Sequence, residues 1–468
     1  MNNTEKSPLE LLQDKLVYTK KSFFEVSDEE KKNAALEYAK GYMAYLDSSK
    51  TEREAVISAI ELAKKAGYTE YKIGDKLTAG GKYYLNNRGK SLFVFKLGSE
   101  DVEKEGIKIT AAHVDSPRLD LKPVPLYEAS GMSFLKTHYY GGVRKYQWTA
   151  IPLALHGVVA LTDGTVKDIV IGEDEGDPIF YINDLLPHLA ADQNSKPLGS
   201  AISGESLNLL SGSSPAFDGT GKDEIKLNVL RILNEKYGIV ETDFISAELT
   251  AVPVFKARDI GLDRWLIGSY GHDDRVCAYP ALTSLLDSAD TKHTVICVLA
   301  DKEEVGSDGV SGMQCRMLAD IIDEISEFAN ANANTVRMQS ACLSADVCAA
   351  YDPNFPEVFE LRNAAMLSCG VSLCKYTGSR GKGGSNDASA EFVGKVRACL
   401  EENNVNWQMA ELGKIDVGGG GTVAKFVANH NIDTVDIGVP VISMHAPYEV
   451  VSKADVYSAY LAFAAFIK

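Results

Sequence analysis

Short apolar runs alternate with helical stretches through the second half of this chain, and few architectures accept such an order. Helices are expected over residues 275–288, 317–329, 388–400 and 452–468, with strands at residues 294–300, 341–347 and 435–444. Strands that alternate with helices form βαβ units, in which helices cover both faces of a sheet. The pattern therefore predicts an α/β protein.

The first third of the chain supplies more elements of this kind. Ser27–Glu30 and Thr51–Glu54 have the spacing of capping boxes, each followed by an amphipathic stretch. Apolar runs rich in β-forming residues at 91–97 and 107–113 are typical of buried strands. We expect these elements to complete the α/β sheet and its helical cover.

The middle of the chain has a different texture. From about residue 117 to residue 270, short apolar runs are separated by glycine, proline and aspartate, which is typical of a β-rich unit. The simplest organisation is one α/β domain made from both ends of the chain, with a β-rich domain inserted. The expected boundaries are residues 1–116 and 271–468 for the α/β domain and residues 117–270 for the insertion.

Charge and cysteine content exclude several classes of partner and location. Lys and Arg number 48 against 65 Asp and Glu, so the net charge is −17 over 468 residues. A surface this acidic repels phosphate backbones and anionic lipid, so we expect neither a nucleic acid nor a membrane as partner. The eight cysteines lack the spacing of a zinc ribbon or redox motif, and no apolar signal run opens the chain. These features predict a reduced, cytoplasmic protein.

Histidines and acidic residues stand where several predicted strands end. His113 and Asp115 lie two residues apart, on one face of an extended chain. Glu303 and Glu304 follow the strand at 294–300, and His445 follows the last apolar run. The same residue types recur at Asp346 and in His272-Asp273-Asp274.

Taken singly, each of these residues has a purely structural explanation. A lone histidine at a strand end is commonly a hydrogen-bonded structural residue, and an acidic pair such as Glu303–Glu304 commonly lies in a solvated loop. Asp273 and Asp274 could cap the helix that follows them, and Asp346 could be a turn residue. A functional interpretation therefore depends on the set rather than on any member.

The shared location of the set favours a metal site. Ligands of open α/β sheets gather outside the carboxyl ends of the strands, where these histidines and carboxylates are expected. Two of these histidines and four of these carboxylates in one crevice would repel one another unless cations were present. Mixed nitrogen and oxygen ligands suit zinc, with cobalt or manganese as alternatives, and two metal ions about 3.5–4 Å apart form a cocatalytic arrangement for hydrolysis. The set predicts a dinuclear hydrolytic site.

Five ordered segments resemble the aspartyl aminopeptidase family, whose members are dinuclear metallo-aminopeptidases that form dodecamers. They are His113-Val-Asp115-Ser-Pro-Arg-Leu-Asp, Lys302-Glu303-Glu304-Val-Gly-Ser, Ser344-Ala-Asp346, Asp416-Val-Gly-Gly-Gly-Gly-Thr422 and Ser443-Met-His445. The resemblance runs from about residue 10 to the C-terminus. It implies a metallopeptidase α/β/α sandwich with an inserted dimerisation domain, and a homo-oligomer that acts on peptides with a free N-terminus.

The resemblance also implies a role for seven residues of the set. The implied ligands are His113 and Asp346 for one metal ion, Glu304 and His445 for the other, and Asp273 for both. Glu303 is the implied general base, which takes a proton from water and passes it to the leaving amine. Asp115 is implied to orient His113.

Two segments that bear on specificity depart from the better-known branch of this family. Residues 141–148 lack a histidine that helps to shape the substrate site there. Arg380 and Lys382 could bind an acidic substrate side chain, since arginine clamps a carboxylate through two hydrogen bonds, or could be ordinary surface charges. The resemblance implies a preference for N-terminal Asp or Glu. A neutral or broad-specificity aminopeptidase and a catalytically silent binding module are the alternatives.

Overall fold

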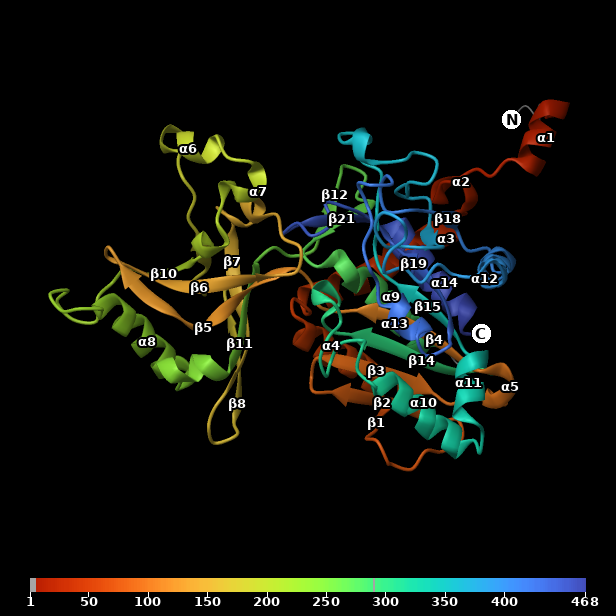
Figure 1. The fold of residues 1–468 in the computed structure, drawn as a ribbon, viewed down its shortest axis with the longest axis horizontal. Coiled ribbons are helices and arrows are strands. Elements are labelled where there is room, and N and C mark those ends of the chain that lie inside the picture. The colour runs from red at the N-terminus through yellow and green to blue at the C-terminus, as the bar shows by residue number, and fades with distance from the viewer. Residues whose placement is uncertain (1–5, 289–290) are drawn as a thin grey trace.

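The computed structural model describes residues 6–288 and 291–468, which form a large α/β body and a β-rich body beside it (Figure 1). A nine-stranded sheet is the centre of the α/β body. Its order is β1 (Thr69–Glu70), β2 (Lys82–Asn87), β3 (Ser91–Lys96), β14 (Thr294–Ala300), β4 (Ile107–His113), β15 (Ala341–Ala345), β19 (Asp433–Gly438), β17 (Val371–Cys374) and β18 (Trp407–Met409).

The four central strands β14, β4, β15 and β19 are parallel, and antiparallel strands β3 and β17 flank them. Ala300, the last residue of β14, pairs with His113, the last residue of β4. The carboxyl ends of these strands therefore meet at one edge, which is where an open α/β sheet binds its ligands.

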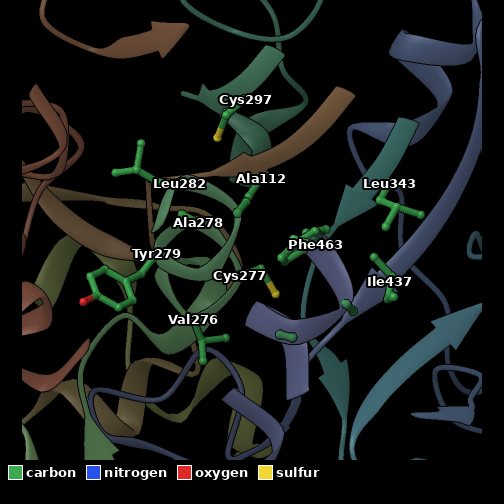
Figure 2. Close-up of a cluster of buried hydrophobic side chains, with 14 of the residues drawn as sticks. Ala112, Val276, Cys277, Ala278, Tyr279, Leu282, Cys297, Leu343, Ile437 and Phe463 are labelled. Carbon is green, nitrogen blue, oxygen red and sulfur yellow. The ribbon is translucent and has the colours of Figure 1, made fainter. Parts of the chain in front are cut away.

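Helices cover both faces of this sheet, so the predicted α/β fold class is confirmed. One face packs against α3 (Glu29–Asp47), α4 (Glu52–Lys65), α9 (His272–Asp287), α12 (Ala390–Glu402) and α14 (Lys453–Phe466). The other packs against α10 (Met317–Phe328), α11 (Ala333–Gln339) and α13 (Ala424–Ala428). In the first core, Cys277 of α9 and Phe463 of α14 lie between the helices and Leu343 and Ile437 of the sheet (Figure 2). These side chains are fully buried.

Two local predictions differ from the structure. The run at 435–444 divides into β19 and β20 (Pro440–Ile442), because Pro440 has no N–H to continue a ladder and begins a strand of another sheet. That five-stranded sheet has the order β12 (Arg258–Ile260), β13 (Leu266–Ser269), β21 (Glu449–Ser452), β20 and β16 (Cys348–Ala349). The capping box at Ser27 is wrong: Asp28 caps α3 by accepting the Lys31 N–H, and Ser27 ends α2 (Phe23–Val26).

The β-rich body is an antiparallel sheet packed against one long helix, α8 (Glu224–Tyr237). Its strand order is β11 (Ala247–Pro253), β5 (Arg118–Ala129), β6 (Met132–Tyr140), β10 (Leu209–Gly212), β9 (Phe180–Ile182), β7 (Pro152–Ala160) and β8 (Val166–Ile171), with β11 also paired to β7. Trp148 and Leu119 are fully buried in its core. The remaining helices are α1 (Pro8–Leu16), α5 (Val102–Glu105), α6 (Ala191–Asn194) and α7 (Leu198–Ala201). Within the described ranges, no helix has the length and apolarity needed to cross a bilayer.

Candidate metal centre

The carboxyl edge of the nine-stranded sheet brings together five of the predicted site residues. His113 ends β4, Asp346 directly follows β15, and Glu304 follows β14 in a short 3-10 helix, residues 303–305. Asp273 lies in the first turn of α9, and His445 follows β20. They form two clusters of three: His113, Asp273 and Asp346 in one, and Asp273, Glu304 and His445 in the other. Within each cluster, the candidate ligand atoms lie no more than 4.8 Å apart.

The Asp273 carboxylate belongs to both clusters through its two oxygens. Its Oδ1 lies 3.2 Å from His113 Nε2, and its Oδ2 lies 3.0 Å from His445 Nε2. His113 Nε2 is also 3.7 Å from Asp346 Oδ1, while His445 Nε2 is 3.5 Å from Glu304 Oε1. One carboxylate thus lies between two otherwise separate imidazole–carboxylate pairs.

Hydrogen bonds to the far nitrogen of each ring orient both imidazoles toward the clusters. His113 Nδ1 is 3.0 Å from the Asp115 carbonyl oxygen, and His445 Nδ1 is 2.9 Å from the Gly142 carbonyl oxygen. A carbonyl only accepts, so each Nδ1 carries the proton and donates it. In the neutral ring, Nε2 then presents a lone pair to the clusters, as a metal-ligating histidine does.

The lone pairs of the two imidazoles face carboxylate oxygens, and this arrangement is stable only if positive charge lies between them. Asp273 Oδ1 and Glu304 Oε1 are buried and accept no well-aligned hydrogen bond from any described residue. Burial alone would lower the pKa of His445, but Asp273 raises it to about 10. Burial, reinforced by Asp273, raises the pKa of Glu304 well above its usual range. The chain alone therefore retains protons where cations would neutralise the same groups, and this donor set fits divalent zinc.

Glu303 lines the same cavity without belonging to either cluster. The cavity has a volume of about 390 Å³ and is also lined by the glycine-rich segment 419–421 and by Lys425 and Phe426 of α13. Burial and the nearby Asp346 charge raise the pKa of Glu303 to about 8. Its backbone N–H donates to Asp115 Oδ1 over 3.1 Å, and Asp115 is itself fully buried. A carboxylate with a raised pKa beside a metal-ligand cluster is suited to proton transfer.

Arg380 and Lys382 lie outside the cavity that contains the clusters. Both are exposed and line a smaller hollow of about 50 Å³ next to it. Lys382 Nζ lies 3.8 Å from the centre of the Tyr376 ring and 3.1 Å from an oxygen of Asp387. Tyr376 borders both hollows, so the two cations stand at the rim rather than beside the clusters.

Sequence reasoning missed two residues of this site. Lys425 of α13 lines the main cavity. The run of glycines before it was the only feature of the sequence that could have indicated it. Glu449 is buried at the start of β21, where its Oε1 accepts the His445 N–H over 2.7 Å and its Oε2 accepts the Asp273 N–H over 3.1 Å. An acidic residue that begins a buried apolar strand was the available signal for Glu449.

Histidines and carboxylates clustered beyond the carboxyl edge of a helix-covered sheet define a metal-dependent hydrolase. The family model described as aminopeptidase I zinc metalloprotease (M18) matches residues 45–467. The chain therefore belongs to the M18 family of zinc aminopeptidases, which confirms the family expected from its motifs. A probable M18 family aminopeptidase 1 of Clostridium acetobutylicum is 47% identical over 431 residues, 90% of this chain and 92% of the relative.

Solved structures agree with this assignment. The crystal structure of an M18-family aminopeptidase from Thermotoga maritima has a TM-score of 0.92 at 41% identity, covering 96% of this chain and 99% of that one. The S. cerevisiae mApe1 dodecamer has a TM-score of 0.74 at 21% identity, covering 93% and 97%, and so shares the fold. This protein is thus a metal-dependent aminopeptidase.

Proposed function

We propose that the chain binds two zinc ions and removes acidic N-terminal residues from peptides, with Glu303 as general base. The proposed ligands are His113 and Asp346 for one ion, Glu304 and His445 for the other, and Asp273 for both. The observation that carries the proposal is the Asp273 carboxylate, whose two oxygens face the Nε2 atoms of two different imidazoles at 3.2 and 3.0 Å. This arrangement supports a pair of ions better than a single one.

Glu303 is the residue suited to move protons. Zinc, when bound, lowers the pKa of water and polarises the scissile carbonyl. The Glu303 carboxylate takes a proton from the attacking water and delivers it to the leaving amine, and both transfers need a group that titrates near neutrality. Asp115 holds this machinery in place, since it accepts the N–H groups of Glu303 and Glu304 and contacts His113 Nδ1 over 3.2 Å.

The charge around the cavity supports the acidic preference. Lys425 lines the cavity itself, and Arg380 and Lys382 stand at its rim, so a substrate carboxylate would meet positive charge. The alternative is a neutral or broad specificity, in which the rim cations stay paired as Lys382 is with Asp387.

The proposal is tested by Glu303→Gln, with Asp308→Asn as the matched control on the same loop. The glutamine side chain keeps the shape of the glutamate but cannot accept a proton, so we expect turnover to fall about 10²- to 10⁴-fold, with two zinc ions retained per chain. Hydrolysis of unblocked Asp, Glu, Leu, Ala and Lys anilides, together with zinc content by mass spectrometry, measures both. An active Glu303→Gln enzyme would exclude the base role. Release led by Leu or Ala would exclude the acidic preference.

We further propose that residues 117–270 are a dimerisation domain inserted into a catalytic domain of residues 1–116 and 271–468. The separate antiparallel sheet of residues 118–253 and the nine-stranded sheet drawn from the other two ranges support an inserted domain. Strands β12 and β13 (residues 258–269) pair instead with β21 in the five-stranded sheet of the α/β body. A dodecameric assembly is proposed by analogy with the distant mApe1 dodecamer. The cytoplasmic location inferred from the sequence stays a prediction.

A further inference from the structure

A three-residue segment of the β-rich body reaches the metal-ligand clusters. Tyr140 is the last residue of β6, and its hydroxyl donates to Asp115 Oδ2 over 2.8 Å. Two residues on, the Gly142 carbonyl accepts the Nδ1 proton of His445 over 2.9 Å. Between them, a Cβ added to Gly141 would lie 2.9 Å from Glu304 Oε2. We call residues 140–142 the strap.

Asp115 is the group through which the strap acts on the predicted base. Besides the Tyr140 hydroxyl, it accepts the backbone N–H groups of Glu303 and Glu304, over 3.1 and 3.2 Å, and its Oδ1 lies 3.2 Å from His113 Nδ1. The carboxylate is fully buried, so it depends on protein donors for its hydrogen bonds. A carboxylate that loses one of its donors shifts toward the remaining ones, and the groups it holds shift with it.

The Tyr140 ring is itself held from the β-rich side. Arg118 pairs with Tyr140 across β5 and β6, and its guanidinium lies 4.0 Å from the centre of the ring. Ion pairs of 2.9 Å to Glu52 and 2.8 Å to Asp120 fix the guanidinium. The hydroxyl is therefore preorganised toward Asp115, and little entropy is lost in making that hydrogen bond.

We propose that Tyr140 is a positioning residue, which acts through Asp115 to orient His113 and the Glu303–Glu304 backbone, and that the strap couples the β-rich sheet to the metal site. The inference rests on the proposed ligand and base assignments. It assigns importance in catalysis to a residue that lies outside both metal-ligand clusters and outside the lining of the main cavity. Mutating a hydrogen-bond partner of a metal ligand typically reduces metal affinity or activity about 10- to 100-fold.

The test is Tyr140→Phe, with Tyr139→Phe as the control, because Tyr139 is the adjacent tyrosine and is 44% exposed. We expect Tyr140→Phe to lower kcat about 10-fold or more with little change in KM, to weaken zinc binding in a chelator competition, and to shift the visible spectrum of the cobalt-substituted protein. Tyr139→Phe should match the wild type in all three. Unchanged kcat, zinc affinity and cobalt spectrum in Tyr140→Phe would overturn the inference.

Gly142→Ala provides a second test if Tyr140→Phe does not fold. A Cβ at Gly142 would lie 3.0 Å from His445 Nδ1, so the methyl group must displace the ring or the strap. We expect weaker zinc binding and an altered cobalt spectrum, and an unaltered pair of readouts would contradict the coupling. A wild-type protein that binds no zinc or shows no aminopeptidase activity would refute the proposed function itself. Failure of the strap inference is instead seen only in the variants, so the two outcomes can be told apart.

Discussion

Glu449 fixes the backbone of two candidate ligands that come from different parts of the chain. Its two carboxylate oxygens accept the N–H groups of His445 and Asp273, and the side chain is 1% exposed. Those two residues lie at the ends of a loop and of a helix, where neither N–H has a ladder partner. A buried carboxylate that satisfies both sets the spacing between the imidazole of one cluster and the carboxylate that both clusters share.

We expect Glu449→Ala to leave the Asp273 and His445 N–H groups without their acceptor. The buried Asp273 amide costs about 1–3 kcal/mol in unfolding free energy, and the part-buried His445 amide costs less. Zinc affinity should fall about 10-fold or more, because the ligand backbones are no longer held together. Chelator competition and thermal unfolding measure the two effects. Val450→Ala, the next residue of β21, removes apolar atoms but no acceptor, so it should leave zinc affinity unchanged. Wild-type zinc affinity in Glu449→Ala would exclude this role.

Residues of the site differ in how far a sequence can indicate them. His113 ends one apolar strand and Glu304 follows another, so strand patterning alone places both at one sheet edge. His445 follows an apolar run as predicted, but that run ends in β20 of the five-stranded sheet. Glu449 and Tyr140 act through a backbone amide and through another side chain, and such contacts leave no spacing pattern. Asp273 lies 176 residues from Glu449 along the chain, and Asp115 lies 25 residues from Tyr140. Only the folded backbone brings these groups together.

At the scale of elements, two capping boxes with the same hydrogen bonds have different consequences. Thr51 caps α4 and accepts the Glu54 N–H, while Ser7 caps α1 and accepts the Glu10 N–H. Helix α4 buries one face in the core of the α/β body, whereas no residue of α1 is buried. The cap of a packed helix stabilises the whole body, since packing couples the first turn to the core.

Thr51→Ala should therefore lower the unfolding free energy by about 1 kcal/mol, because the N3 amide loses its acceptor. Ser7→Ala removes an equivalent hydrogen bond and should leave global unfolding unchanged, since α1 can fray by itself. Urea titrations followed by tryptophan fluorescence measure both variants. Equal destabilisation by the two substitutions would show that α1 is packed in solution.

The difference between predicted and observed elements has a physical pattern. Strands at 107–113 and 294–300 match β4 and β14 residue for residue, because continuous apolar runs are buried on both faces. The five-stranded sheet was not predicted, since strands such as Cys348–Ala349 and Pro440–Ile442 are two or three residues long. Strands this short carry no period, and tertiary pairing alone creates them.

At the scale of the whole molecule, an ionic network joins the two bodies. Glu173 follows β8, and its carboxylate contacts Lys50 Nζ at 2.6 Å, His156 Nε2 at 3.1 Å and Lys256 Nζ at 2.7 Å. On the other side of the ring, His156 Nδ1 contacts Glu54 Oε1 at 2.7 Å. Because Glu54 also completes the α4 capping box, the network runs from the helix terminus of one body to the sheet of the other.

The network should stabilise the protein only within a pH window. Burial alone would raise the pKa of Glu173, but His156, Lys256 and Lys50 lower it from 4.5 to about 2. Its contribution is therefore full above pH 4.5 and is lost as the pH falls toward 2. Burial alone would lower the pKa of His156, but Glu173 and Glu54 raise it above 6.5. That contribution is full below pH 6.5 and is lost as the pH rises through the folded-state pKa.

Glu173→Gln tests this window, because glutamine keeps the shape of the side chain but removes the charge that three cationic groups share. With the Glu173 side chain still 15% exposed, solvent screening reduces the effect, and we expect a loss of about 1–2 kcal/mol near pH 6. The difference between variant and wild type should shrink as the pH falls below 4.5, because the Glu173 carboxylate of the wild type then begins to lose its own stabilising contribution. Thermal unfolding from pH 3 to 9 measures it, with Glu235→Gln, an exposed partner of Arg231, as the control. A destabilisation that stays constant across this range would mean that packing, rather than charge, joins the two bodies at this point.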